Sequence, residues 1–190
     1  MSTRPARLMA LTFLLAGLGL TFWGLYIPAK AWLAQQLLEN AWANSHATQA
    51  VKPWPWADTW PVARLGVPGL GISQIVLEGA AGNSLAFGPG HMNGSAGPGE
   101  SGNVVIAGHR DTHFRFLPNL EVGDRLHLED ARGTIWSYRI AGSEVVDSRS
   151  TRLVLLGQSD SHLTLVSCYP FDGLDPGGPL RYLVHAVLEP

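Results

Sequence analysis

The sequence predicts a mainly β protein, a closed or nearly closed β-barrel with short helices, preceded by an N-terminal apolar helix. From Val62 onward, short apolar runs alternate with Gly, Pro, Asn and Asp turn signals, which is typical of many short strands. No part of that region keeps the 3.6-residue periodicity of a long helix. Residues 8–27, in contrast, form one uncharged apolar stretch. These patterns separate an N-terminal segment from a β domain.

The N-terminal segment, residues 1–30, is predicted to be a cytoplasmic tip followed by a transmembrane signal anchor. Residues 8–27 would cross a hydrocarbon core of about 30 Å as a helix. Arg4 and Arg7 precede this stretch, so the positive-inside rule places the N-terminus in the cytoplasm and the rest of the chain outside. The alternative is a signal peptide cleaved near the small residues of 29–31. Under both interpretations, the chain that follows this segment is exported.

Residues 31–60 are predicted to be a helical stalk followed by a Pro/Trp linker. Trp32, Leu38 and Trp42 stand near helical spacing, which favours an amphipathic helix that lies on the membrane or leads into the domain. The prolines of "KPWPWADTWP", residues 52–61, end any helix, because proline lacks a donor and restricts the residue before it. The β domain is therefore placed at residues 61–190.

Seven candidate strands follow within that domain. They cover residues 63–67, 73–79, 102–109, 124–130, 134–146, 162–168 and 181–189. Residues 113–120 are the best candidate for a helical turn. The Gly-rich stretch at 88–102 is predicted to be a loop; it lacks the Gly-Lys-Ser/Thr ending of a phosphate-binding P-loop.

Composition excludes some classes of function. The net charge of -2 and the lack of a Lys/Arg block argue against a nucleic-acid partner, because phosphate binding needs a concentrated basic surface. The chain has a single cysteine, Cys168, so no internal disulfide can form. This thiol is structural, reactive or intermolecular.

Three residues with useful chemistry stand at predicted strand ends: His109, Cys168 and Arg181. A cysteine attacks as its thiolate, which neighbouring cations stabilise. A histidine can protonate a leaving amine, and an arginine can stabilise an oxyanion. Each residue also has an ordinary interpretation, as a packed thiol, a loop histidine and a surface ion-pair partner. Spacing alone does not choose between these interpretations.

Three strings, "GNVVIAGHRDTHF", "LTLVSCYPFD" and "GGPLRYLV", together resemble the sortases, membrane-anchored cysteine transpeptidases with an eight-stranded β-barrel. The resemblance runs from about Trp60 to the C-terminus. It implies that His109 is the catalytic histidine, Cys168 the nucleophile and Arg181 the active-site arginine. Ser167 stands where the family commonly has threonine. The string "GHRDTHF" is similar to the single-copy sortases of Gram-negative bacteria.

The resemblance also implies an activity and a location. The thiol would cleave an LPxTG-like sorting signal of an exported protein through a thioester, and an amine would then accept the acyl group. The enzyme would sit in the inner membrane with its catalytic domain on the periplasmic side. Neither a cofactor nor a metal is implied. The sequence does not identify the sorting motif, the amine or the target protein.

Four further residues are weaker candidates for substrate-binding or supporting roles. Asp111 and His113 lie beside His109, although Asp111 is equally suited to capping the following turn. His91 either lines a groove or is an ordinary loop residue. Ser167 precedes the thiol.

Three alternatives stay open. A cysteine peptidase would use the same residues and pass the acyl group to water. A metal site would use His109, His113 and Cys168, but a structural zinc site needs a fourth ligand. A membrane-anchored binding module would not need the thiol.

Overall fold

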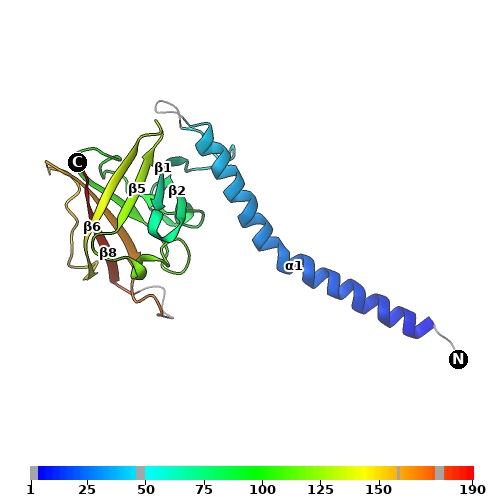
Figure 1. The fold of residues 1–190 in the computed structure, drawn as a ribbon. Helices are drawn as coiled ribbons and strands as arrows, with labels where there is room; N and C mark the ends of the chain where they lie inside the picture. Colours follow the sequence, from blue (N-terminus) through cyan, green and yellow to red (C-terminus); the bar gives the residue numbers. More distant parts are fainter. Residues whose placement is uncertain (1–3, 46–49, 158, 174–177) are drawn as a thin grey trace. The chain divides into compact units, whose positions relative to one another are not determined.

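The computed structural model describes residues 4–45, 50–157, 159–173 and 178–190, and Figure 1 traces their elements. In chain order they are helix α1 (Arg4–Ala43), strand β1 (Pro61–Val67), 3₁₀ turn η1 (Pro68–Leu70), β2 (Ile72–Glu78), α2 (Gly82–Leu85), β3 (Gly90–His91), β4 (Gly102–Ala107), 3₁₀ turn η2 (Leu117–Asn119), β5 (Arg125–Asp130), β6 (Ile135–Asp147), β7 (Ser161–Cys168) and β8 (Leu180–Leu188).

Eight strands within the described residues close into one barrel, in the order β1-β2-β3-β4-β7-β8-β6-β5. Strands β2 and β3 pair in parallel, as do β4 and β7. The other neighbouring strands pair antiparallel. The mainly β fold, with its closed barrel of eight strands, is therefore confirmed. The turn predicted at residues 113–120 contains η2.

The strands form where apolar residues alternate, because alternate side chains of a strand point to opposite faces of the sheet. Along β7, Leu163 and Leu165 are fully buried in the barrel core. Their counterparts on β4 are Val104 and Ile106, which are also fully buried. Burying one face of each strand fixes the register, since a slip of one residue would expose the whole apolar set.

Strand β3 corrects the prediction that residues 88–102 are only a loop. Gly90 and His91 pair with the end of β2 on one side and with Ala107 and Ile106 of β4 on the other. A Cβ on Gly90 would stand 2.2 Å from the carbonyl oxygen of Gly79, so only glycine fits at this pairing. This short strand joins β2 to β4 and completes the barrel.

Helix α1 is continuous from Arg4 to Ala43, with Pro28 inside it. Its stretch Leu11–Ala43 is long and apolar enough to cross a membrane, a test that a signal sequence also passes. The chain divides into two compact units, Met1–Leu37 and Leu38–Pro190. The second unit begins within the helix, so it includes the helix end as well as the barrel. The boundary at residue 61 stays a prediction.

The last turns of α1 belong to the barrel unit through their side chains. Leu38 is fully buried and, with Trp42, packs against Ile75 and Leu77 of β2. The guanidinium of Arg64 on β1 lies 5.9 Å from the centre of the Trp42 ring. The same side chain forms a 2.7 Å ion pair with Glu39 of α1. The amphipathic segment predicted around Trp42 therefore leads into the domain.

We expect Leu38→Ala to lower the free energy of unfolding by about 2–5 kcal/mol, because it leaves a cavity between α1 and β2. Urea unfolding of a fragment that begins near residue 31 would measure the change. Leu33→Ala is the matched control, since Leu33 is exposed on the same helix. Equal stabilities of the two variants would mean that the helix end is not packed against β2 in solution.

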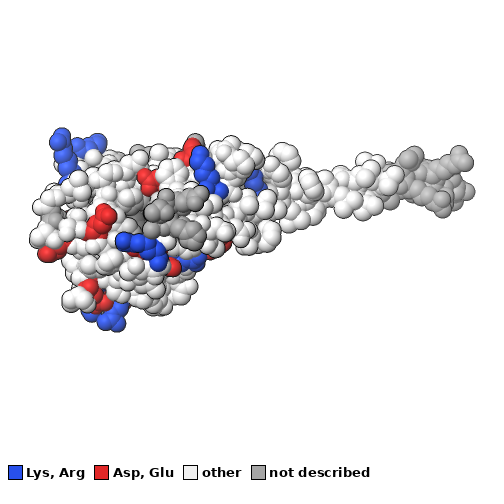
Figure 2. Space-filling model, turned by 90° about the horizontal axis from the view of Figure 1, so that it is seen from above, with Lys and Arg blue, Asp and Glu red and all other residues white. Residues whose placement is uncertain are grey.

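Charges are mixed on the face of the protein drawn in Figure 2, where basic and acidic side chains of the barrel are interspersed. Ion pairs within the barrel domain, such as Arg132–Asp130 and Arg149–Asp147, also place opposite charges next to each other. The face shown therefore offers no continuous basic surface of the kind that phosphate backbones bind.

Candidate active site

Strands β4, β7 and β8 are consecutive in the barrel. Three of the predicted site residues, His109, Cys168 and Arg181, stand at or next to the ends of these strands. Cys168, the last residue of β7, pairs directly with Arg181, the second residue of β8. Directly opposed residues of antiparallel strands have Cβ atoms about 5 Å apart. The thiol and the arginine are therefore cross-strand neighbours.

His109 follows the end of β4, on the other side of β7. The parallel register pairs Ala107 with Val166, and the Gly108 amide donates a 3.0 Å hydrogen bond to the Val166 carbonyl. The Ser167 hydroxyl then donates to the Gly108 carbonyl at 2.9 Å. Neighbouring strands are spaced by about 5 Å. Continuing this register places His109 beside Cys168.

The site lies on the outer surface at one end of the barrel. Leu165 and Ser167 are buried on the core side of β7, so alternation directs Val166 and Cys168 outward. Cys168 is half-buried, whereas His109 is exposed. A thiol in this position is accessible to a molecule that binds along the outside of β7.

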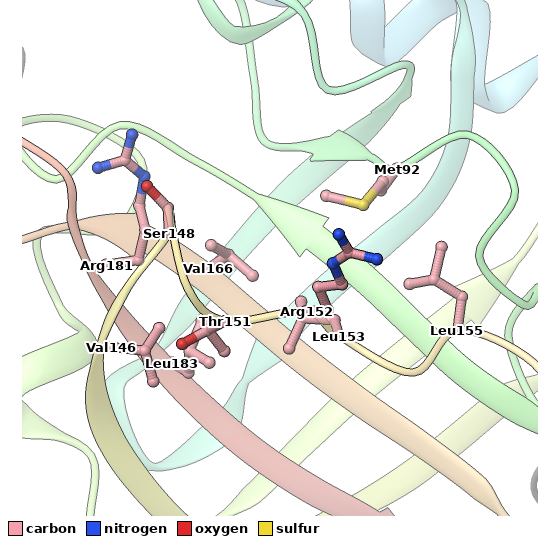
Figure 3. A pocket seen from close by; sticks show the side chains of 10 residues that line it. All are labelled: Met92, Val146, Ser148, Thr151, Arg152, Leu153, Leu155, Val166, Arg181 and Leu183. Carbon is pink, nitrogen blue, oxygen red and sulfur yellow. The ribbon is translucent and has the colours of Figure 1, made fainter.

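A groove of about 510 Å³ runs along this outer surface (Figure 3). Val166 from β7 and Leu183 from β8 form part of its floor, and Arg181 stands at one end. The lining residues are Met92, Val146, Ser148, Thr151, Arg152, Leu153, Leu155, Val166, Arg181 and Leu183. The lining is mostly apolar and includes two guanidinium groups. Cys168 is not one of the lining residues, but it pairs with Arg181, which is.

One wall of the groove is the segment between β6 and β7, for which the sequence predicted neither structure nor role. Asn103 of β4 holds this segment: its backbone amide donates to the Leu155 carbonyl at 2.9 Å and its side-chain amide to the Val154 carbonyl at 3.4 Å. The signal in the sequence is an apolar run, residues 153–156, without alternation. An apolar run without alternation fits a segment that packs against a strand, here β4, on one side and lines the groove on the other.

Arg181 is only partly engaged by the protein. Its Nη1 donates to the carbonyls of Gly178 and Leu180, at 2.7 and 2.8 Å. Its Nε and Nη2 form no hydrogen bond with any residue that the structure describes. Because guanidinium donors are fixed in one plane, the two remaining groups can bind an oxygen without rearrangement of the first contacts.

The supporting candidates are dispersed around this centre. Ser167 is buried and links β7 to β4 through Gly108. Asp111 is exposed and accepts a hydrogen bond from Arg110 at 3.1 Å. It does not cap η2, which begins after Phe116 without a side-chain cap.

His91 is not one of the residues that line the groove. Its Nε2 lies 2.9 Å from the Ala96 carbonyl oxygen and 3.0 Å from the Ser95 hydroxyl. It lines a separate cavity of about 170 Å³, together with Glu78. The adjacent residue Met92 lines the groove instead.

His113 is half-buried, and its surroundings favour the neutral imidazole. Burial, and secondarily the charge that His109 can carry, lower the pKa of His113 from its ordinary value of 6.5. A neutral His113 does not add a second positive charge beside the site.

The lowered pKa of His113 makes stability depend on pH. The unfolded chain protonates this imidazole near pH 6.5, whereas the folded chain does so only at lower pH. The free energy of unfolding therefore falls as pH decreases from 6.5 through the folded pKa. We expect His113→Gln to reduce the loss of stability between about pH 8 and pH 5 in urea titrations. Parallel pH dependences of the variant and the wild type would contradict this expectation.

The metal-site alternative needs converging ligands. Over the ranges that the structure describes, no group of three or more His, Cys, Asp and Glu side chains is arranged to hold a metal ion. His109, His113 and Cys168 thus do not form a ligand cluster.

Comparisons with known proteins give the family and the fold of the chain. The family described as "Sortase domain" matches residues 65–189. Sortase D of Bacillus subtilis is 35% identical over 121 residues, which are 64% of this chain and 60% of that protein. The chain thus spans about three-fifths of the length of this curated relative.

Two solved structures extend the likeness. A sortase D5 transpeptidase of Clostridium perfringens superposes with a TM-score of 0.67 at 24% identity, covering 83% of this chain and 99% of that one. A variant of sortase E from Streptomyces avermitilis has a TM-score of 0.57 at 30% identity, covering 68% of this chain and 88% of that one. The first likeness supports the fold, and the second also reflects a related sequence.

Proposed function

The chain belongs to the sortase family, and from this premise we propose that it is a cysteine transpeptidase with Cys168 as nucleophile. One observation carries the proposal: the only thiol of the chain pairs with Arg181, which lines an apolar groove, and its strand also pairs with β4, the strand that ends before His109. A packed thiol would need none of these neighbours.

The proposed reaction follows from these three side chains. The Cys168 thiolate attacks the carbonyl carbon of the scissile peptide bond, and the electron pair moves to the oxygen. Arg181 stabilises this oxyanion through its Nε and Nη2 donors. When the tetrahedral intermediate collapses, the C–N bond breaks and His109 transfers a proton to the departing amine. A thioester remains on the sulfur.

The second half of the reaction regenerates the enzyme. An amine attacks the thioester carbonyl and passes its proton to His109, and the thiolate leaves. The product is a new peptide bond between the acyl group and the amine. Transfer to water would give the peptidase alternative, which differs only in the nucleophile of this step.

We propose an LPxTG-like sorting signal of an exported protein as the substrate, cleaved after its threonine. The groove supports a peptide with apolar side chains, because Met92, Val166 and Leu183 line it. The five-residue LPxTG-like signal would be about 16 Å long in an extended conformation. The experiment below is designed to find the peptide sequence that is cleaved and whether a simple amine is accepted.

The location is also a proposal. The apolar stretch of α1 is consistent with a membrane anchor. Arg4 and Arg7 support a cytoplasmic N-terminus, which would leave the barrel on the extracytoplasmic, periplasmic side of the inner membrane. The string "GHRDTHF", residues 108–114, supports membership in the Gram-negative subgroup.

The test uses a fragment that begins near residue 31, so that Leu38 and Trp42 stay in place against β2. It is incubated with an LPxTG-type peptide library and a simple amine, and the products are read by mass spectrometry. A thioester adduct and an amine-exchanged product cut after threonine are expected. Hydrolysed product alone, with several amines tried, would favour the peptidase. No adduct with any peptide from a folded protein would contradict the proposal.

A further inference from the structure

We propose that Arg110 is a positioning residue for the reaction proposed above: its buried guanidinium ties the chain that carries His109 to the chain that leaves Cys168. The inference rests on the proposed function, because it concerns the relative placement of these two side chains. Arg110 is not one of the residues that line the groove.

The burial of Arg110 is unusual for a charged residue in a turn. Only 6% of its side chain is exposed, although it stands between the exposed residues His109 and Asp111. A buried guanidinium is costly unless its donors are paired. Its position must therefore be set by specific partners.

Two of these partners are main-chain carbonyls from the segment after the nucleophile. Nη1 donates to the Pro170 carbonyl at 2.6 Å, and Nη2 donates to the Gly173 carbonyl at 2.5 Å. Nε donates to the carboxylate of Asp111 at 3.1 Å. Hydrogen bonds from a charged donor are stronger than neutral ones, and the planar fork fixes direction as well as distance. Arg110 therefore holds the turn that begins two residues after Cys168.

The turn is shaped around this guanidinium. A Cβ added to Gly173 would stand 3.2 Å from Nη1 of Arg110 and 3.0 Å from Cγ of Pro170. The Gly173 amide also donates to the Pro170 carbonyl at 3.3 Å. The hydrogen bonds from Arg110 to the carbonyls of Pro170 and Gly173 are called the clamp below. A side chain at residue 173 would press on the clamp, so a substitution there is a second way to disturb it.

The Arg110 hydrogen bonds matter because no described side chain orients the imidazole directly. No side chain among the described residues forms a hydrogen bond with the His109 ring. Its position relative to the thiol therefore depends on the backbone at residue 109. That backbone is held before the histidine by the Ser167 bond to Gly108, and after it by the Phe114 amide, which donates to the His109 carbonyl at 3.0 Å. Arg110 adds the direct link to the chain beyond Cys168.

The principal test compares Arg110→Lys with Arg115→Lys. Arg115 lies in the same segment and is exposed, and its side chain donates to a single described partner, the Asp111 carbonyl, at 2.9 Å. Lysine keeps the charge but cannot bind two carbonyls with a planar fork. We expect kcat of Arg110→Lys to fall by about 10- to 100-fold, with KM within about threefold of wild type, because misplacement by about 1 Å has effects of this size. Arg115→Lys should match the wild type.

A second readout does not need a substrate. The rate of Cys168 alkylation by iodoacetamide is measured against pH, since it follows the ionisation of the thiol and its neighbours. The profiles of Arg110→Lys and of Gly173→Ala should shift together relative to wild type. Gly173→Ala keeps the arginine, so a common shift assigns the effect to the clamp. The profile of Arg115→Lys should stay unchanged.

The outcomes separate this inference from the proposed function. If the wild type forms a thioester and Arg110→Lys retains full kcat, the positioning role is wrong. A loss of kcat that disappears when the variant is assayed below its lowered Tm would also overturn it, since that loss reflects stability alone. If the wild type forms no thioester, the proposed function fails, and the alkylation profiles decide: shifted profiles support the clamp and unchanged profiles contradict it.

Discussion

Replacing Cys168 with alanine is expected to abolish thioester formation and acyl transfer completely. The chain contains no other thiol, so no second sulfur can take over the nucleophilic step. Losses on the order of 10⁶-fold are typical when a covalent nucleophile is removed. Intact-mass spectrometry is the direct measurement, because any thioester on the wild type adds the mass of one acyl group at one possible sulfur.

Cys168→Ser is the matched control, since it keeps the size and polarity of the side chain beside Arg181. It should bind peptide as the wild type does, yet form no adduct at a comparable rate, because an alcohol is a weaker nucleophile than a thiolate. Full function of Cys168→Ala in the host would mean that the barrel acts as a membrane-anchored binding module. The thiol would then be a packing residue.

His109→Ala is expected to lower kcat for peptide cleavage by about 10²- to 10⁴-fold, the range typical of a lost general acid. The departing amine is a poor leaving group without a proton. The matching ester substrate has an alkoxide leaving group that depends less on protonation, so its cleavage should suffer less. A stopped assay with the amide and the ester in parallel measures the difference.

His113→Ala serves as the control for His109→Ala, since this neighbouring histidine is half-buried and has no proposed part in proton transfer. Its kcat should remain within a few-fold of wild type. Equal losses on the amide and the ester for His109→Ala would contradict the acid role. They would instead assign His109 to formation of the thiolate.

The sequence predicted the strands whose one face is buried, because alternation is visible there. The predicted strand 162–168 differs from β7 by one residue, and 63–67 lies within β1. Strand β3 was missed because two residues cannot show a period of two. Its existence depends on the ends of β2 and β4, with which it pairs. Such a strand is determined by its neighbours and by the space that Gly90 leaves.

The candidate site was only partly accessible to sequence reasoning. Patterns placed His109, Cys168 and Arg181 at strand ends, but the adjacency of β4, β7 and β8 depends on strand order. Only the family resemblance indicated that these three residues belong to one catalytic site. Arg110 was missed because a charged residue in a polar turn ordinarily faces solvent. Its burial depends on carbonyls 60 and 63 residues further along the chain.

The parallel pairing of β4 with β7 also affects how the protein acquires its site during folding. The Ser167–Gly108 hydrogen bond closes a sequence separation of 59 residues. Long-range pairings of this kind form slowly, because the chain must lose loop entropy before the contacts stabilise it. Local structure can therefore form before the imidazole and the thiol become neighbours. During refolding, catalytic competence should consequently appear with closure of the barrel, and the reactivity of the lone thiol should change from its unfolded-chain value at the same moment.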